Sequence, residues 1–315
     1  MNHITRVTEL KLALFTVTYC GLWYRGEALS LKEQIKKAKE LGFDGITIET
    51  KRPVALPIDL GRSARKEITE LAGSLGITIA AVETMSNFAN PIIEHRENNL
   101  IMVKECIELA NDLGAPIVKV FAAWRGTMRV EGIGWYPEEV VYVPSPTVLQ
   151  QWSWCVEGIR EASRWAEEYG ITLALQNHPP VINYGYEDAL QMVNEVGEDN
   201  VKLCLDVPLF DRQDDEYIKE AVERCRDLIV LSHYSSLHFD ELPSGEIVQR
   251  PAAYLPGKPL VNYRAFIGEL SKIGYKGFLS SEECSPVLEG HQHAGMDVVD
   301  RHVKAALRYM RQVLS

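Results

Sequence analysis

One unit recurs along the chain, and it constrains the fold more than any other feature. An amphipathic helix ends in a glycine, and a run of β-forming residues follows within a few positions. The clear copies close on Gly42, Gly76, Gly114, Gly170 and Gly274. Glycine adopts the left-handed conformation that closes a helix, which other residues reach only at a cost. Alternating helices and strands of this kind form a mostly parallel sheet.

Filling the gaps between these copies gives eight strand–helix pairs. The expected strands are 11–18, 44–50, 77–84, 116–123, 171–177, 201–206, 228–234 and 277–283. The expected helices are 30–41, 63–75, 95–113, 147–169, 186–196, 214–226, 262–273 and 297–314. Eight successive pairs predict an α/β fold, a single (β/α)8 TIM barrel over residues 1–315. A doubly wound sheet is the alternative, but no glycine-rich phosphate-binding motif follows a strand.

Two connections are longer than the minimal repeat. They run over 124–147, after the fourth strand, and over 235–261, after the seventh. Both follow strands, so both fall on the face where barrel enzymes keep their active sites. Loops of this length predict a covered active site. Surface decoration or a subunit interface is the alternative interpretation.

Composition argues against several classes of protein. The 33 basic and 44 acidic residues give a net charge of −11. This charge disfavours nucleic acid as a partner, because phosphate binding draws on Lys and Arg. No apolar run reaches the ~18 residues that a membrane span needs. Six scattered cysteines without a C-x-x-C pair indicate a reduced, cytoplasmic setting.

The ends of four successive strands carry side chains that could bind a metal ion. Gln176, Asp206, His233 and Glu282 can each take the last inward position of their strand, because side chains alternate along a strand. Amide, carboxylate and imidazole groups together suit a divalent ion. Taken singly, Asp206 could cap a turn, His233 could be a satisfied buried histidine and Glu282 could pair with a lysine. Their joint placement favours one shared site.

These strand ends also carry a family resemblance that runs from Leu12 to about Leu314. Its segments are LALQNH at 173–178, LD at 205–206, LSH at 231–233, PGKP at 256–259 and GFLSSE at 277–282. The chain resembles the xylose-isomerase-like TIM-barrel superfamily of sugar phosphate isomerases and epimerases, whose barrel also includes endonuclease-IV-type repair enzymes. The resemblance implies a divalent cation, Mn²⁺ before Co²⁺, Mg²⁺ or Zn²⁺. It assigns Gln176, Asp206, His233 and Glu282 as the ligands.

Three positions depart from the family pattern. Gln176 replaces a glutamate, so a negative charge and a proton acceptor are lost while an amide oxygen remains. Leu209 stands where epimerases and nuclease relatives often have histidine, and Ser236 stands where the strand-seven signature has aspartate. We therefore expect an intact metal site with altered catalytic groups.

The leading hypothesis is a metal-dependent sugar or keto-sugar isomerase or epimerase. A metal that binds vicinal oxygens stabilises an enediolate after a base removes the proton α to the carbonyl. Glu282 is the expected base, and His178 is a second acid–base or substrate-binding candidate unless it only caps the Pro179–Pro180 turn. The lost glutamate keeps two alternatives open, a lyase (a dehydratase, or β-elimination from a 3-keto-sugar) and a non-catalytic binding subunit. An endonuclease is disfavoured by the acidic charge and by the presence of only eight histidines.

Other polar residues near the strand ends are candidate substrate contacts. Trp124 could stack on a sugar ring and Arg125 could hold an anionic group. Lys119 could contact substrate or form an ion pair within the barrel. Glu49 and Glu83 end their strands at matching positions, so one could face the mouth, although surface salt bridges are the favoured interpretation. The expected partners are a small carbohydrate and further copies of the chain, with a hetero-oligomer as the alternative.

Overall fold

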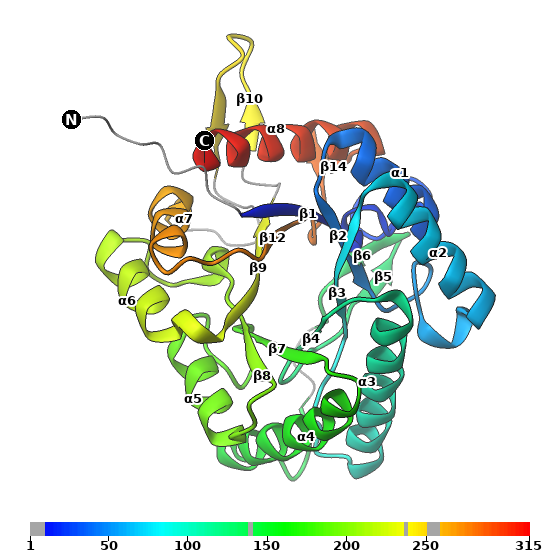
Figure 1. Cartoon of the computed structure of the whole chain (residues 1–315), viewed down its shortest axis with the longest axis vertical. Coiled ribbons are helices and arrows are strands. Elements are labelled where there is room, and N and C mark those ends of the chain that lie inside the picture. Colours follow the sequence, from blue (N-terminus) through cyan, green and yellow to red (C-terminus); the bar gives the residue numbers. More distant parts are fainter. Residues whose placement is uncertain (1–9, 138–140, 236–238, 251–258) are drawn as a thin grey trace.

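Eight parallel strands close a barrel at the centre of the computed structural model, which describes residues 10–137, 141–235, 239–250 and 259–315 (Figure 1). The strands are β1 (Lys11–Phe15), β2 (Gly45–Glu49), β3 (Thr78–Glu83), β4 (Ile117–Val120), β7 (Thr172–Gln176), β8 (Val201–Cys204), β9 (Ile229–Ser235) and β12 (Phe278–Glu282). Around the barrel they follow the order β1-β12-β9-β8-β7-β4-β3-β2. The predicted TIM barrel is therefore confirmed.

Helices surround the barrel and cover its outer face (Figure 1). They are α1 (Leu31–Leu41), α2 (Arg62–Leu75), α3 (Ile93–Leu113), α4 (Val148–Glu168), α5 (Glu187–Val196), α6 (Asp215–Cys225), α7 (Tyr263–Lys272) and α8 (Met296–Leu314). Of the helices in the described ranges, none has the length and apolar character needed to cross a membrane. A capping box begins α1: the Ser30 side chain accepts from the Glu33 N–H, and the Glu33 carboxylate accepts from the Ser30 N–H.

The first strand is shorter than predicted. It ends at Phe15, and a 3-10 helix takes over at Thr16–Tyr19. In this 3-10 helix, the hydroxyl groups of Thr16 and Thr18 accept hydrogen bonds from the ends of two barrel strands. Thr16 Oγ1 accepts from the Glu49 N–H at 2.8 Å, and Thr18 Oγ1 accepts from the Glu283 N–H at 3.2 Å.

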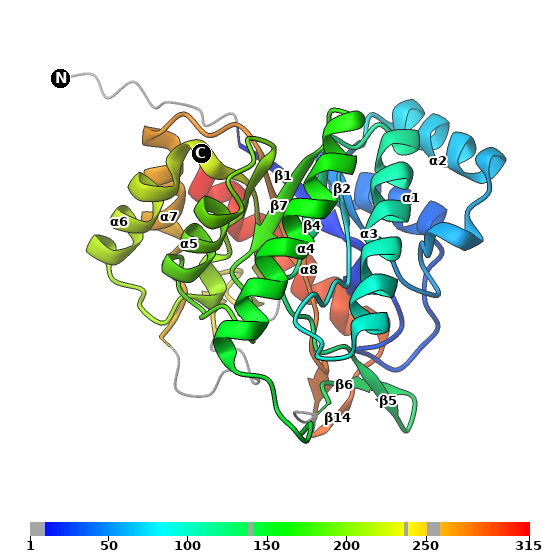
Figure 2. The same cartoon turned by 90° about the horizontal axis from the view of Figure 1, so that it is seen from below.

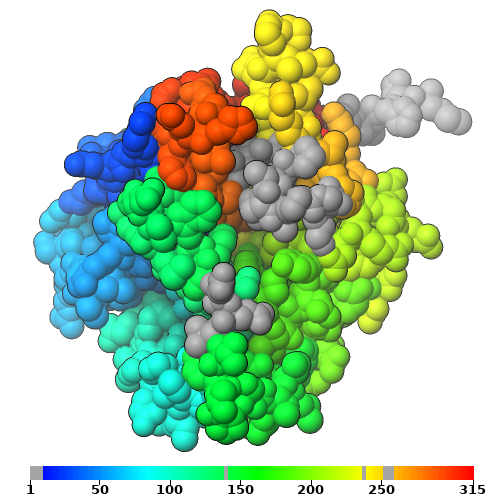
Figure 3. All heavy atoms as spheres, turned by 180° about the vertical axis from the view of Figure 1, so that it is seen from behind, coloured from blue at the N-terminus to red at the C-terminus, as the bar shows by residue number. Residues whose placement is uncertain are grey.

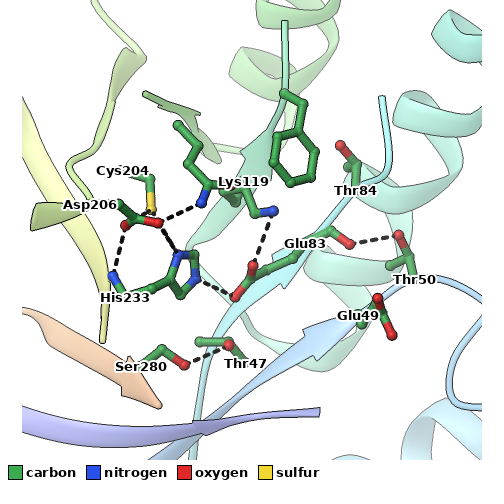
Figure 4. Close-up of polar contacts among 12 residues, drawn as sticks. Thr47, Glu49, Thr50, Glu83, Thr84, Lys119, Cys204, Asp206, His233 and Ser280 are labelled. Carbon is green, nitrogen blue, oxygen red and sulfur yellow. Dashed lines mark hydrogen bonds and ion pairs between the residues drawn. The ribbon is translucent and has the colours of Figure 1, made fainter. Parts of the chain in front are cut away.

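Most of the core lies between the strands and the helices, and a second, smaller cluster fills the barrel interior. That cluster contains Ala81, Ala174, Cys204 and Leu231. Beside it, Thr47 on β2 and Ser280 on β12, the two strands that flank β1, share a hydrogen bond of 2.8 Å (Figure 4). The polar site described below lies above this interior layer, at the carboxyl ends of the strands.

Short hairpins follow β4, β9 and β12, and the hairpin after β9 packs against α8 at the edge of the molecule (Figure 1). They are β5 (Met128–Val130) with β6 (Ile133–Trp135), β10 (Phe239–Glu241) with β11 (Ile247–Gln249), and β13 (Leu288–Glu289) with β14 (Gln292–His293). Figures 2 and 3 show the β5–β6 hairpin beside the β13–β14 segment, where Trp135 and His293 meet edge to face. Within these connections, 138–140, 236–238 and 251–258 lie outside the described residues, including Ser236 and most of the PGKP segment.

Candidate active site

Three of the four predicted metal ligands touch one another at the barrel mouth. The Gln176 amide Nε2 donates to Asp206 Oδ2 at 2.5 Å. The same Asp206 oxygen lies 2.9 Å from His233 Nδ1. The amide oxygen of the same side chain, Gln176 Oε1, is buried and has no hydrogen-bond partner within the described ranges. Three of the four predicted side chains therefore lie together, and Gln176 Oε1 is left as an oxygen donor; the role of the set as metal ligands stays a prediction.

Backbone contacts fix Asp206 just beyond the end of β8. Its own N–H donates to Asn177 Oδ1 at 2.6 Å, and the Asn177 amide donates back to the Asp206 carbonyl. Asp206 Oδ1 in turn accepts the His233 N–H at 2.8 Å. The carboxylate is thus oriented by β7 on one side and by β9 on the other. The alternative interpretation of Asp206 as a side-chain cap is not observed, since the following 3-10 helix has no such bond.

Glu83 and Lys119 extend this cluster on the far side of His233 (Figure 4). Glu83 Oε1 lies 3.1 Å from His233 Nε2, and Glu83 Oε2 lies 3.3 Å from Lys119 Nζ. Glu83 is 0% exposed and Lys119 is 1% exposed. Lys119 Nζ also lies 3.6 Å from the centroid of the Phe121 ring, a cation–π contact.

The charges in this cluster shift one another's protonation. Burial alone would raise the pKa of Glu83, but the charges of His233 and Lys119 hold it below its usual value. Burial likewise opposes the ionised form of Asp206, yet His233 lowers the pKa of this carboxyl. For His233, burial favours the neutral ring, but Asp206 and Glu83 raise its pKa well above the usual value. Both ring nitrogens of His233 therefore donate to carboxylates in this state.

A cavity of about 190 Å³ opens beside the cluster. This volume is about six times the ~30 Å³ that a water molecule occupies in the liquid, so a small organic molecule can enter. The polar or ionisable residues that line it include Glu49, Lys51, Lys119, Arg125, Gln176, His178, Glu282 and Cys284. Apolar and aromatic side chains supply the rest of the wall, as is usual for small-molecule sites.

Aromatic rings form one side of this cavity. Trp124 stacks on Phe121 with centroids 4.7 Å apart, and the His178 ring meets both with its edge at 5.3 and 5.1 Å. The His178 Nδ1–H donates to the Pro179 carbonyl at 2.7 Å. Removal from water lowers the pKa of His178 to about 4. His178 is therefore a neutral ring whose Nε2 remains an acceptor.

Glu282 and Arg125 also reach the cavity wall. Glu282 ends β12 and is half-buried. Removal from water raises the pKa of Glu282 to about 7, and the carboxylates of Asp206 and Glu83 act in the same direction against the opposing charge of His233. Arg125 is exposed at the rim, where a guanidinium could meet an anionic group.

Two expectations about acidic residues are corrected by the structure. Glu49 and Glu83 do not form surface salt bridges, because each is buried at 1% exposure or less. Their partners are the cations Lys51 and Lys119, which also lie at the barrel mouth. Glu83 is not among the described residues that line the cavity, so its predicted contact with substrate remains a prediction.

One neighbour of this cluster, Cys204, was not predicted from the sequence. Cys204 Sγ lies 3.4 Å from Asp206 Oδ1 and 3.6 Å from His233 Nδ1, close enough to count among possible metal donors. The signal was available, because Cys204 precedes Asp206 by two positions and so shares its side of the strand. Burial raises the pKa of this thiol.

Comparison with known proteins agrees with this architecture. A sequence model of the family described as xylose isomerase-like TIM barrel matches residues 35–312. The chain belongs to the xylose isomerase-like TIM barrel family. The resemblance at the strand ends is thereby confirmed, and the observed cluster lies where that resemblance places the family's cation site.

Several members of the xylose isomerase-like family can be compared in sequence or in structure. The fructoselysine 3-epimerase of Shigella flexneri is 26% identical over 286 residues, which cover 87% of this chain and 90% of the relative. An inosose isomerase of Bacillus velezensis is 28% identical over 176 residues, covering 54% and 60%. The solved D-psicose 3-epimerase of Clostridium cellulolyticum shares the fold at a TM-score of 0.71 and 20% identity, covering 97% of this chain and 100% of that one. An E. coli 3-keto-D-glucoside 4-epimerase shares it at 0.67 and 17%, covering 96% and 99%.

Proposed function

We propose that the protein is a divalent-metal-dependent keto-sugar epimerase or isomerase that abstracts a proton α to a carbonyl. The observation that carries this proposal is the convergence of Gln176, Asp206 and His233 beside a cavity that Glu282 also lines. Relatives named as a fructoselysine epimerase and inosose isomerases support the same reaction class. The proposed substrate is a small carbohydrate, in keeping with the cavity volume.

The residues present fit a divalent cation. Gln176 Oε1 is a buried oxygen without a hydrogen-bond partner among the residues described, so it is free to act as a ligand. Asp206, His233 and Glu282 complete a set of oxygen and nitrogen donors that suits Mn²⁺, with Co²⁺, Mg²⁺ or Zn²⁺ as alternatives. Glu83 on His233 Nε2 resembles the outer carboxylates that orient metal-binding imidazoles. The bound ion would stabilise negative charge that develops on the oxygens of the substrate.

The side chains that line the cavity would abstract the proton and bind the substrate. Glu282 is the proposed base, because it is a carboxylate at the cavity wall and carboxylates serve this role at carbon next to a carbonyl. His178 offers a neutral Nε2 that can accept a substrate hydroxyl proton in a hydrogen bond. Trp124 presents a ring for stacking on a sugar face. Lys119 and Arg125 supply positive charge on the side of β4.

One observation favours a second candidate function. Gln176 is an amide, so it cannot serve as the second proton-transfer group that a two-glutamate epimerase would place there. Elimination of a β-substituent from a 3-keto-sugar needs one base and the metal, and this makes a lyase the alternative. If neither reaction occurs, the remaining hypothesis is that the protein is a binding subunit without catalytic activity.

Metal analysis followed by NMR in D₂O tests the proposal. The purified protein is first assayed for bound metal and then incubated with a panel of keto-sugars. The panel contains D-psicose, D-tagatose, an inosose, fructoselysine and a 3-keto-glucoside, in line with the relatives. An epimerase or isomerase introduces solvent deuterium at the carbon next to the carbonyl and keeps every substituent, whereas a lyase releases water or the aglycone. A filled metal site with neither change contradicts both enzymatic proposals.

A further inference from the structure

A buried carboxylate stands on the wall of the cavity that carries none of the metal ligands. Glu49 ends β2, is 1% exposed and lines the cavity together with Lys51. Its Oε1 pairs with Lys51 Nζ at 2.7 Å. Its Oε2 is buried and has no hydrogen-bond partner in the described part of the chain. Figure 4 shows Glu49 apart from the contacts that join Glu83, His233 and Asp206.

The fold itself does not explain this carboxylate. A buried carboxyl oxygen without a partner is unfavourable. Among the described residues, the Glu49 carboxylate has an ion pair with Lys51 through Oε1 and no hydrogen bond through Oε2. The backbone N–H of Glu49, which donates to Thr16 Oγ1, would hold the strand in place with any side chain. Burial raises the pKa of Glu49, and the Lys51 charge only partly opposes this. Buried acidic groups with shifted pKa values concentrate at functional sites.

The strand order places Glu49 outside the arc of strands that carries the proposed ligands. Gln176, Asp206, His233 and Glu282 belong to β7, β8, β9 and β12, which form one continuous arc of the barrel. The other arc consists of β1, β2, β3 and β4, and Glu49 is on β2. Glu282 and Glu49 both line the cavity, and their strands β12 and β2 are the two neighbours of β1. A substrate carbon held between these two side chains would present one face to each carboxyl group.

We propose that Glu49, held by Lys51, is the second acid–base residue of the epimerisation and takes the place of the glutamate that Gln176 replaces. This inference rests on the proposed epimerase function. It predicts that two carboxyl groups act on the two faces of the reacting carbon, one from β12 and one from β2, the strands that flank β1.

The proton balance of the step is complete with these two groups. The Glu282 carboxylate takes the α-hydrogen as a proton, and the C–H electron pair forms the double bond of the enediolate while the carbonyl oxygen gains the charge. The protonated Glu49 then gives its proton to the other face of the same carbon, and the electron pair returns to re-form the carbonyl. Glu282 ends protonated and Glu49 ionised, so before the next turnover in the same direction Glu282 releases a proton to water and Glu49 takes one up from water. No atom is oxidised or reduced overall.

A Glu49→Gln variant tests this assignment. The substrates are the two epimers that the wild type interconverts, and the measurement is the exchange of the α-hydrogen for deuterium in D₂O. Epimer formation should fall about 10²- to 10⁴-fold, the usual contribution of an acid–base group. The epimer whose α-hydrogen faces Glu282 should still exchange that hydrogen for deuterium, whereas the other epimer should not. Bound metal and Tm should match the wild type, and Glu49→Asp should recover part of the rate because the carboxyl group is retained.

The controls separate this inference from the proposed function. Glu167→Gln, at an exposed position on α4, should behave as wild type. Interconversion by Glu49→Gln at the wild-type rate overturns the role of Glu49 and leaves the epimerase proposal standing. Equal loss of exchange from both epimers also overturns it, because Glu49 would then only position the substrate. If the wild type exchanges no hydrogen in any keto-sugar, the proposed function itself fails.

Discussion

Replacing Gln176 by glutamate would restore the carboxylate that the family pattern places on this strand. In the structure, the Gln176 amide donates to Asp206 Oδ2 at 2.5 Å, and both side chains are buried. An ionised glutamate would instead set two acceptors with like charges against each other. We therefore expect the new side chain of Gln176→Glu to be protonated in the metal-free protein.

The size of the effect follows from this protonation. Holding a glutamic acid of ordinary pKa, about 4.3, in its protonated form at pH 7 costs about 3.7 kcal/mol, at ~1.36 kcal/mol per pKa unit. The protonated acid can donate the same hydrogen bond, so this is the main loss. A chain of 315 residues unfolds with an entropy of about 0.7 kcal/mol per K, so Tm should fall by about 5 to 6 °C. Because the folded-state pKa lies above the unfolded value, the penalty shrinks to about 1 kcal/mol at pH 5.

Calorimetry with and without Mn²⁺ measures the prediction. Wild type and Gln176→Glu are freed of metal, scanned at pH 7 and pH 5, and scanned again with MnCl₂. The variant should show the larger Mn²⁺-induced rise in Tm, because binding to the native state stabilises it and a carboxylate binds the ion more strongly than an amide.

Gln34 offers a matched control within the same chain. It is fully buried on α1, its Nε2 donates to the Leu29 carbonyl at 3.1 Å, and its Oε1 also lacks a partner in the described ranges. Gln34→Glu should lose stability without gaining a response to Mn²⁺. Equal metal-free Tm values for wild type and Gln176→Glu would refute the contact between Gln176 and Asp206. An equal Mn²⁺ response in the two glutamate variants would remove Gln176 from the metal site.

Three further predictions concern other parts of the molecule. Glu83→Gln should weaken Mn²⁺ binding about 10- to 100-fold in a calorimetric titration, with an unchanged circular dichroism spectrum; unchanged affinity would contradict its role in orienting His233. Trp124→Ala should raise KM about 2- to 10-fold, from a loss of ~0.5 to 1.5 kcal/mol of ring contacts, with kcat unaltered in steady-state kinetics. Ser30→Ala should lower Tm by about 1 to 2 °C through the lost cap. The bonds from Ser30 lower the pKa of Glu33, so this deficit should shrink as the pH falls below the Glu33 pKa and the carboxylate is protonated.

The repeat predicted the barrel because the end of each helix depends on residues that are close in sequence, above all on the glycine that closes it. Gly42 and Gly76 close their helices with φ of 90° and 66°, and Gly274 follows α7 with φ of 75°, all in the left-handed region that glycine favours. The early end of β1 could not be predicted in this way. Thr16 and Thr18 turn away because each accepts a bond from a strand far along the chain, at Glu49 and Glu283.

The convergence of Gln176, Asp206 and His233 was predictable because alternation along a strand fixes which side chains face inward. The acidic residues Glu49 and Glu83 obey the same alternation. Burying a lone carboxylate is unfavourable, however, so the sequence favoured surface salt bridges for both residues. The compensating contacts come from outside the local sequence. Glu83 meets His233, which lies 150 positions away in sequence, and only the closed barrel brings the two together.

The amide at Gln176 suits the charge pattern of the buried cluster. From Lys119 through Glu83, His233 and Asp206, positive and negative groups alternate and balance. The Gln176 Nε2–H completes this series as a donor to Asp206 and leaves Oε1 for a cation. An amide cannot carry a proton between substrate and water, however. The proposed epimerisation then needs a second proton-transfer carboxyl group from elsewhere, and among the described residues that line the cavity Glu49 is the carboxylate other than Glu282.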